Sequence, residues 1–199
     1  MATLLHDDII DCSPLRRHKE SPFLKYGSTN SLLCGDFLLV RAFSLCAHLD
    51  SFIIDETERA CIELTEGEIE EIPLHKRPGN LKDSLEIARK KTASLFRLCA
   101  ASAAHLAANY KPATDAFSRF GENLGIAFQI LDDILDVVSD EATLGKKAGI
   151  DIHERKPSIV NVFWLEENTP LSRGLLNEPK GTEESYIAES ILELKSGAA

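Results

Sequence analysis

The fold is decided by the stretch GIAFQILDDILD, residues 125–136, in which apolar residues recur with the spacing of one helix face. The same period runs through most of the 199 residues, and β-branched clusters bounded by hairpin turns are missing. The pattern predicts an all-α protein. We expect helices at residues 1–11, 28–49, 51–72, 82–109, 112–138, 157–167 and 182–196. Prolines and glycines separate them without a low-complexity linker, so we expect a single domain over residues 1–199.

The composition argues against several classes of protein. Thirty-two acidic and 22 basic residues give a net charge of −10, which disfavours a broad attraction to nucleic acid or anionic lipid. The five cysteines are odd in number and form no Cys-x-x-Cys pair, so we expect free, buried thiols in a reducing compartment. No uncharged apolar stretch is long enough to span a bilayer. We therefore expect a cytoplasmic protein without a transmembrane segment or a nucleic-acid partner.

One acidic pattern occurs twice, as DDIID at residues 7–11 and as DDILD at residues 132–136. On a helix the first and third carboxylates of each copy project from the same face, with the second beside them. Such a cluster of like charge needs a cation or surrounding water, so a solvated acidic face is the plain alternative. With thirteen Asp in the chain, one copy is expected by chance roughly 0.05 times. The second copy therefore indicates function.

The ligand chemistry of these two motifs favours magnesium. Hard carboxylate oxygens suit Mg²⁺, which keeps much of its water and is usually held by one or two carboxylates together with substrate phosphates. Zinc is disfavoured because the six histidines show no His-Glu-x-x-His spacing. A Walker A or Gly-x-Gly-x-x-Gly loop is also missing, which argues against nucleotide chemistry.

Short motifs in a fixed order extend the pattern beyond the aspartates. They are Leu15-Arg16-Arg17, Tyr26-Gly27, Gly35-Asp36, Lys91-Thr92, Leu144-Gly145-Lys146 and Gly149-Ile150-Asp151. Together with the two acidic motifs, they resemble the trans-prenyl diphosphate synthase family. The resemblance implies an isoprenoid synthase-type helical bundle around a central cavity, with the acidic motifs facing each other across its mouth. It also implies a homodimer, with a heteromer as the alternative.

The reaction implied by the resemblance is the head-to-tail condensation of isopentenyl diphosphate with an allylic diphosphate. The family's metal ligands correspond to Asp7, Asp8, Asp11 and Asp132. Lys91 and Lys146 would add positive charge at the allylic diphosphate, which Arg16 would contact, while Arg17 would bind isopentenyl diphosphate. Thr92 would also bind substrate, and Gln129, Asp133 and Asp136 would complete the second wall of the site. Taken alone, each basic residue would be an ordinary surface side chain.

The length of the product is suggested by the residues about one turn before the first aspartate. In the family, bulky side chains there form the floor of the product cavity, whereas this chain has Ala2 and Thr3. The resemblance thus implies a long product, from hexaprenyl to decaprenyl, of the kind used for quinone side chains. Ala2 could also be just a good helix former, and a farnesyl or geranylgeranyl synthase is the short-chain alternative.

Several features depart from the family pattern. The upstream Gly-Lys-x-x-Arg motif and a downstream His have no counterpart, and the last helices are missing, so we expect a bundle that is incomplete at both ends, and this chain could be inactive. Glu71 replaces a frequent Gln, and Arg155, Ser158 and Val160 stand where Gly, Thr and Pro are usual. A non-catalytic subunit of a heteromeric synthase, a terpene cyclase and a helical scaffold are the alternatives; two intact Asp triads argue against the first two.

Overall fold

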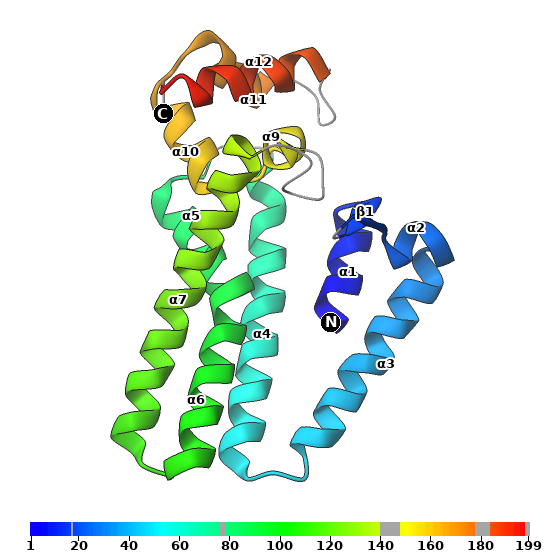
Figure 1. Cartoon of the computed structure of the whole chain (residues 1–199), viewed down its shortest axis with the longest axis vertical. Coiled ribbons are helices and arrows are strands. Elements are labelled where there is room, and N and C mark those ends of the chain that lie inside the picture. The colour runs from blue at the N-terminus through cyan, green and yellow to red at the C-terminus, as the bar shows by residue number, and fades with distance from the viewer. Residues whose placement is uncertain (17, 76–78, 140–147, 178–183, 198–199) are drawn as a thin grey trace. The chain divides into compact units, whose positions relative to one another are not determined.

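A computed structural model describes residues 1–16, 18–75, 79–139, 148–177 and 184–197 (Figure 1). Arg17 and Lys146, two of the predicted substrate-binding residues, lie outside these ranges. Helices dominate the described residues, and the strands are limited to one two-stranded hairpin. The all-α class is therefore confirmed.

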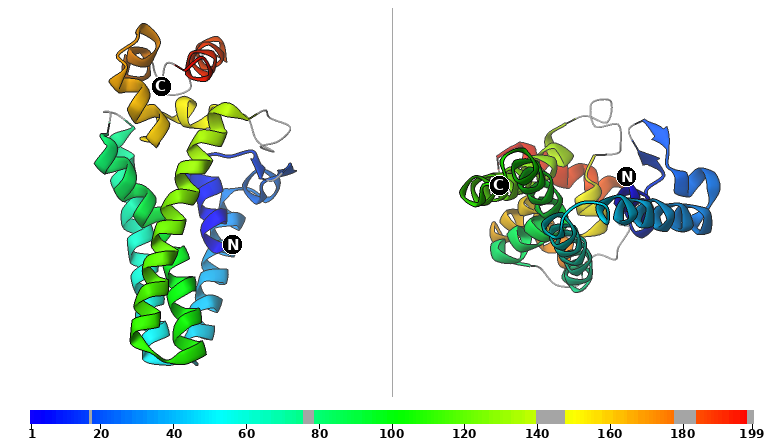
Figure 2. Two further views of the ribbon diagram at one scale, coloured as in Figure 1. Left: turned by 60° about the vertical axis from the view of Figure 1, so that its left-hand side comes forward. Right: turned by 90° about the horizontal axis from the view of Figure 1, so that it is seen from below.

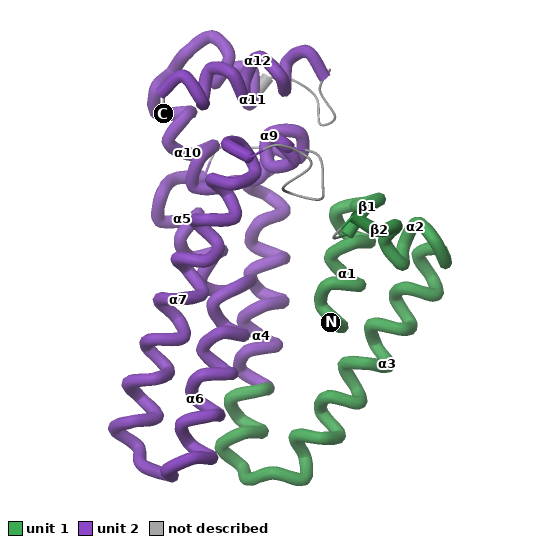
Figure 3. Tube along the Cα trace, in the orientation of Figure 1, with its two compact units in different colours: residues 1–57, 140–147 green, residues 58–139, 148–199 purple. Residues whose placement is uncertain are grey.

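The chain divides into two compact units, which Figure 3 distinguishes by colour. Unit 1 covers residues 1–57 and contains α1 (Ala2–Ile10), β1 (Leu15–Arg16), β2 (Lys19–Glu20), α2 (Pro22–Tyr26), α3 (Ser28–Cys46) and the start of α4 (Ser51–Leu74). Unit 2 contains the rest of α4, α5 (Leu81–Ile87), the π-helix η1 (Ala88–Ala93), α6 (Ser94–Ala108), α7 (Lys111–Val138), α9 (Ile150–Glu154), α10 (Ile159–Glu166), α11 (Pro170–Asn177) and α12 (Glu184–Lys195). The single-domain assignment stays a prediction.

In unit 1, α1 packs against α3 through the smallest residue of that helix. A Cβ atom built on Gly35 would lie 2.2 Å from Nε2 of His6, so a side chain at this position would require the His6 ring to move. Ser21 begins α2, because its hydroxyl accepts a hydrogen bond from the N–H of Leu24 at 3.3 Å and Pro22 follows at the first helical position. These contacts hold the two short helices beside α3.

In unit 2, α6 and α7 form a long helical hairpin, whose two helices lie side by side in Figures 1 and 2. Asn109 ends α6 in the left-handed conformation, and Pro112 lies in the first turn of α7. Two glycines of α7 permit the close packing. A Cβ on Gly121 would lie 2.6 Å from the carbonyl oxygen of Phe96, and one on Gly125 would lie 2.5 Å from Cα of Ala93. The hairpin therefore brings the middle of α7 directly onto η1.

The hydrophobic core of unit 2 lies at the end of α7 that carries the second acidic motif. Its buried members are Val137, Ile152, Trp164, Leu175 and Leu194. The fully buried indole of Trp164 donates a hydrogen bond from Nε1 to the carboxylate of Glu193 at 2.8 Å. A buried indole N–H needs such an acceptor. The core thus anchors α9, α10, α11 and α12 around the motif-bearing end of α7.

The helices differ from the expected ones in how they are divided, where one of them ends and how many there are. The single helix expected at residues 82–109 is divided into α5, η1 and α6, and α4 continues past Pro73 to Leu74. Helices α2, α9 and α11 are additional. Five-residue helices such as α2 and α9 are too short for their periodicity to be recognised in a sequence.

The prediction of free thiols is confirmed, and the prediction that they are buried is wrong. All five thiols are free, but Cys12, Cys34 and Cys99 are exposed rather than buried. Within the described ranges, every helix is too short or too polar to cross a membrane.

Candidate functional site

The π-helical turn η1 presents two consecutive lysines to the glutamates of α4. Lys91 Nζ lies 3.0 Å from Oε1 of Glu68 and also pairs with the carboxylate of Glu71. Lys90 Nζ lies 2.6 Å from Glu70 and 3.1 Å from Glu66. A π-helical turn holds more residues than an α-helical turn, so adjacent side chains diverge less around the axis. Both ammonium groups therefore face the same helix.

Lys91 and both of its glutamate partners are mostly enclosed by the protein. Its side chain is 21% exposed, and those of Glu71 and Glu68 are 10% and 20% exposed. Burial alone would lower the pKa of Lys91, but the two carboxylates outweigh it and leave the pKa above its ordinary value. Lys91 is therefore a fixed positive charge at neutral pH.

The close approach of η1 to α4 depends on Gly67, which lies within the run of glutamates. A Cβ built on Gly67 would lie 2.8 Å from Cγ of Lys91, 2.9 Å from Cβ of Lys90 and 3.1 Å from the backbone nitrogen of Lys91. Any side chain at this position would push η1 away. Gly67 therefore sets the distance at which the lysines meet their carboxylates.

A chain of hydrogen bonds connects η1 to the second acidic motif. The hydroxyl of Thr92 donates to Oε1 of Gln129 at 2.6 Å, and Nε2 of Gln129 donates to Oδ1 of Asp133 at 2.8 Å. Oδ2 of Asp133 accepts the backbone N–H of Ile159 at 2.9 Å. Burial raises the pKa of Asp133, and these two donors oppose that effect. The second motif is thereby tied to both η1 and the start of α10.

The three aspartates of the second motif differ in exposure. Asp133 and Asp136 are buried, whereas Asp132 is exposed. Oδ2 of Asp136 accepts the backbone N–H of Asp151 at 3.1 Å, which attaches α9 to the end of α7. Of the three side chains, that of Asp132 is the most exposed.

In the first acidic motif, which lies in unit 1, the middle aspartate is the buried one. Asp8 is 2% exposed, and its Oδ1 accepts hydrogen bonds from Nε and Nη2 of Arg16 at 2.8 and 2.6 Å. Asp7 and Asp11 are half-buried. Asp11 follows the last residue of α1 with helical dihedrals and donates its backbone N–H to the carbonyl of Asp7 at 2.8 Å. The predicted substrate ligand Arg16 thus contacts a predicted metal ligand, Asp8.

His6 lies beside the first motif and points at α3. Its Nε2 is 3.2 Å from the carbonyl oxygen of Leu32 and 3.3 Å from Oδ1 of Asp36. A neutral ring can donate to only one of these acceptors at a time. The histidine therefore links α1 to α3.

The donor set of the two motifs fits magnesium rather than a metal that needs a complete protein cage. In the part of the chain that the structure describes, His, Cys, Asp and Glu side chains nowhere gather in a group of three that could hold a metal ion. Mg²⁺ is commonly bound by one or two carboxylates, with water and substrate phosphates completing its octahedron. Asp7, Asp11 and Asp132 provide such accessible carboxylates.

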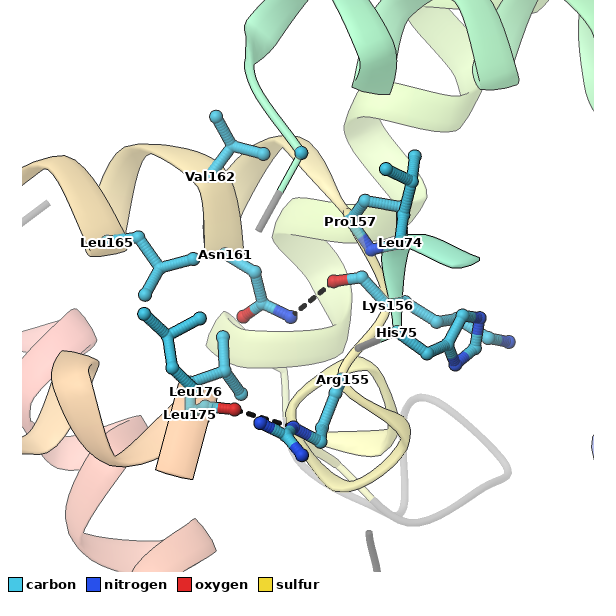
Figure 4. Close-up of a pocket in the computed structure, with 11 residues that line it drawn as sticks. Leu74, His75, Arg155, Lys156, Pro157, Asn161, Val162, Leu165, Leu175 and Leu176 are labelled. Atoms are coloured by element: carbon cyan, nitrogen blue, oxygen red, sulfur yellow. Dashed lines mark hydrogen bonds between the residues drawn. The ribbon is translucent and has the colours of Figure 1, made fainter. Parts of the chain in front are cut away.

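The small pocket drawn in Figure 4 lies in unit 2. It is lined by the end of α4 and by α10 and α11, with Asn161 and Arg155 at its wall. Its volume of about 20 Å³ is close to that of one water molecule. None of the predicted site residues lines it. The central product cavity, and the role of Ala2 and Thr3 in the first turn of α1, stay predictions.

Comparison with known proteins decides the family. Residues 1–194 match the family model described as polyprenyl synthetase. The chain belongs to the polyprenyl synthetase family. It is 36% identical over 203 residues to the all-trans-nonaprenyl-diphosphate synthase (geranyl-diphosphate specific) of Rhodobacter capsulatus, covering 99% of this chain and 62% of that protein. The short chain isoprenyl diphosphate synthase of Methanocaldococcus jannaschii is 30% identical over 169 residues, covering 82% of this chain and 52% of that protein.

The fold of this polyprenyl synthetase family member also matches solved structures. The polyprenyl synthase of Caulobacter crescentus CB15, crystallised with calcium and isoprenyl diphosphate, superimposes with a TM-score of 0.92 at 32% identity. The match covers 99% of this chain and 61% of that one. The chain therefore spans about three fifths of the length of the Rhodobacter capsulatus and Caulobacter crescentus proteins. It has the isoprenoid synthase helical fold.

Two residues of this site escaped the sequence analysis. Gly67 and Glu68 were not singled out, and Glu71 was noted only as a departure from the family. The spacing of the glutamates along α4 opposite a Lys-Lys pair is the signal that could have found them.

Proposed function

We propose that this member of the polyprenyl synthetase family is a prenyltransferase that condenses isopentenyl diphosphate with an allylic diphosphate. One observation carries the proposal: Thr92, Gln129 and Asp133 join the Lys-Thr turn to the second acidic motif by direct hydrogen bonds. A cation and a carboxylate cluster held in one framework form the kind of site that binds a metal-diphosphate. Neither group alone would do so.

The reaction needs charge stabilisation more than it needs proton transfer. The allylic C–O bond breaks, the diphosphate leaves with the electron pair, and the double bond of isopentenyl diphosphate attacks the resulting carbocation. The condensed cation then loses a proton, which the released diphosphate can accept as a base, and the new double bond forms. Lys91 would stabilise the negative charge that grows on the departing diphosphate. Thr92 and Gln129 would hold Lys91 in register with the motif. Arg16 would act in unit 1, where a guanidinium can bind phosphate oxygens in a forked geometry.

Magnesium fits the accessible carboxylates of both motifs. Asp7 and Asp11 would bind it in unit 1 and Asp132 would bind it in unit 2, with Asp8 as a further ligand in the family pattern. When bound, Mg²⁺ supplies positive charge that neutralises the leaving diphosphate. The buried Asp133 and Asp136 would instead fix the geometry of α7 against α9 and α10.

We infer a long-chain product, in the hexaprenyl to decaprenyl range used for quinone side chains. The small residues Ala2 and Thr3 support it, as does the similarity to a nonaprenyl diphosphate synthase. A short-chain product is the second candidate, favoured by the similarity to the archaeal short chain enzyme. The homodimer and the cytoplasmic location stay predictions from the resemblance.

The test is an elongation assay with the purified chain. It is incubated with Mg²⁺, farnesyl diphosphate and labelled isopentenyl diphosphate, and the products are sized by chromatography. Asp132→Asn should lower the rate by at least about 100-fold, because the exposed motif carboxylate is removed. Asp115→Asn is the matched control, since this aspartate lies on the same helix and forms an exposed ion pair with Lys111.

The outcomes separate the candidates. Products of 30 or more carbons support the long-chain assignment, whereas a product that stops at 20 carbons, one addition to the 15-carbon primer, supports the short-chain one. If Asp132→Asn elongates as fast as Asp115→Asn, or if the chain neither elongates nor binds farnesyl diphosphate with Mg²⁺, the proposed function is wrong.

A further inference from the structure

Lys91 pairs with two carboxylates that the proposed reaction does not require. Its ammonium group faces those of Glu68 and Glu71. Because all three side chains are mostly buried, water screens these carboxylates poorly. A diphosphate approaching Lys91 therefore meets a carboxylate as well as an ammonium.

The neighbouring lysine provides an internal comparison. Lys90 also has two glutamate partners, but the side chains of Glu66 and Glu70 are 53% and 48% exposed. Exposed ion pairs are screened by water and contribute little. The Lys90 side chain is itself only 12% exposed. The same charge arrangement thus occurs twice in one turn, once with exposed glutamates and once with enclosed ones.

The backbone cannot relieve the enclosed cluster. Gly67 leaves no gap between α4 and η1, since a Cβ there would already lie 3.1 Å from the backbone nitrogen of Lys91. On its other side, η1 is held against Gly125 and through the bond from Thr92 to Gln129. Release of Lys91 from a carboxylate therefore requires movement of side chains alone.

We propose that Glu71 sets the affinity of the Lys91 site for diphosphate by competing with the ligand for the ammonium group. The inference rests on the proposed function, because it assigns Lys91 to diphosphate binding. Glu71 is the more buried of the two carboxylates and the closer partner. A bound diphosphate must displace it or accept a negative neighbour, and either event weakens binding. Glu71 is thus an affinity-determining residue of the site.

The experiment measures binding of inorganic pyrophosphate to the full chain in the presence of Mg²⁺ by titration calorimetry. Glu71→Gln keeps the shape of the side chain and removes its charge, and it should tighten the dissociation constant on the order of tenfold. Glu70→Gln makes the same change beside Lys90 in solvent and should change it less than about twofold. In a Lys91→Met background, the effect of Glu71→Gln should vanish.

Each result has one meaning. Tightening that occurs with Glu71→Gln alone and is lost with Lys91→Met supports the inference. If Glu71→Gln and Glu70→Gln bind pyrophosphate equally well, or if tightening persists without Lys91, the inference is wrong while the proposed function stands. If no form of the chain binds pyrophosphate with Mg²⁺, the proposed function itself fails. Circular dichroism of each variant distinguishes a lost fold from lost binding.

Discussion

Replacement of Gly125 by alanine tests how the hairpin of α6 and α7 positions the site. The new Cβ would lie 2.5 Å from Cα and 2.8 Å from Cβ of Ala93, whereas carbon atoms normally pack about 3.5–4.0 Å apart. A backbone atom cannot rotate away, so η1 and α7 must separate by about 1 Å. That displacement would break the 2.6 Å hydrogen bond from Thr92 to Gln129 one turn later.

The magnitude follows from two opposing terms. Overpacking in a core typically costs about 1–3 kcal/mol, and a backbone clash belongs at the upper end. Replacement of glycine by alanine within a helix returns about 1 kcal/mol. We therefore expect Gly125→Ala to lower the free energy of unfolding by about 2 kcal/mol, and to slow elongation because Lys91 shifts relative to the second motif.

Urea denaturation followed by the fluorescence of Trp164 measures this effect. Trp164 is the only tryptophan and is fully buried in unit 2, so it reports on the unit that carries Gly125. Asn123→Ala is the control, because this residue is exposed on the same helix and its replacement should raise the unfolding midpoint slightly. If Gly125→Ala also raises the midpoint, close packing at this glycine does not hold the site together.

Two further substitutions probe the ion pairs. Arg16→Gln leaves the 2%-exposed carboxylate of Asp8 without its charged donor. We expect the free energy of opening α1 to fall by about 2 kcal/mol, which mass spectrometry would detect as roughly 30-fold faster amide hydrogen exchange in this helix. Unchanged exchange would contradict the pairing. The hydrogen bond from Arg89 lowers the pKa of Glu86 below its ordinary 4.5, so its contribution to stability is present above that value and is lost as the pH falls through the lowered pKa. Glu86→Gln should therefore lower the free energy of unfolding at pH 7 by no more than about 0.5 kcal/mol after solvent screening, with a smaller effect at pH 3. Thermal denaturation at both pH values measures it, and Glu58→Gln, at an exposed position of α4, is the control.

The helical class could be predicted from sequence because apolar periodicity is repeated over many turns. The acidic motifs could be located in the same way, since α7 keeps its period from Lys111 to Val138. The π-helical turn at residues 88–93 could not, because its hydrogen-bond register differs from that of an α-helix while its residues are ordinary helix formers. Yet this turn determines which partners Lys91 meets.

The partners of the predicted site residues were also beyond the sequence analysis. Arg16 lies eight residues from Asp8, and Lys91 lies 20 residues from Glu71. Contacts at such separations depend on how helices pack, and packing depends on close approaches such as that at Gly67. Motif order thus predicts which residues form the site, whereas the contacts of these residues are visible only in the structure.

The two acidic motifs share one feature of burial and hydrogen bonding although they lie in different units. In each, the middle aspartate is buried and accepts hydrogen bonds from protein donors: Asp8 from Arg16, and Asp133 from an amide side chain and a backbone N–H. The first aspartate of each, Asp7 or Asp132, is more accessible. Protein donors therefore offset the charge of the middle aspartate in each motif before any metal ion binds. The repulsion that a metal would have to relieve is correspondingly smaller, and a magnesium-diphosphate would bring its own oxygen ligands to the more exposed carboxylates.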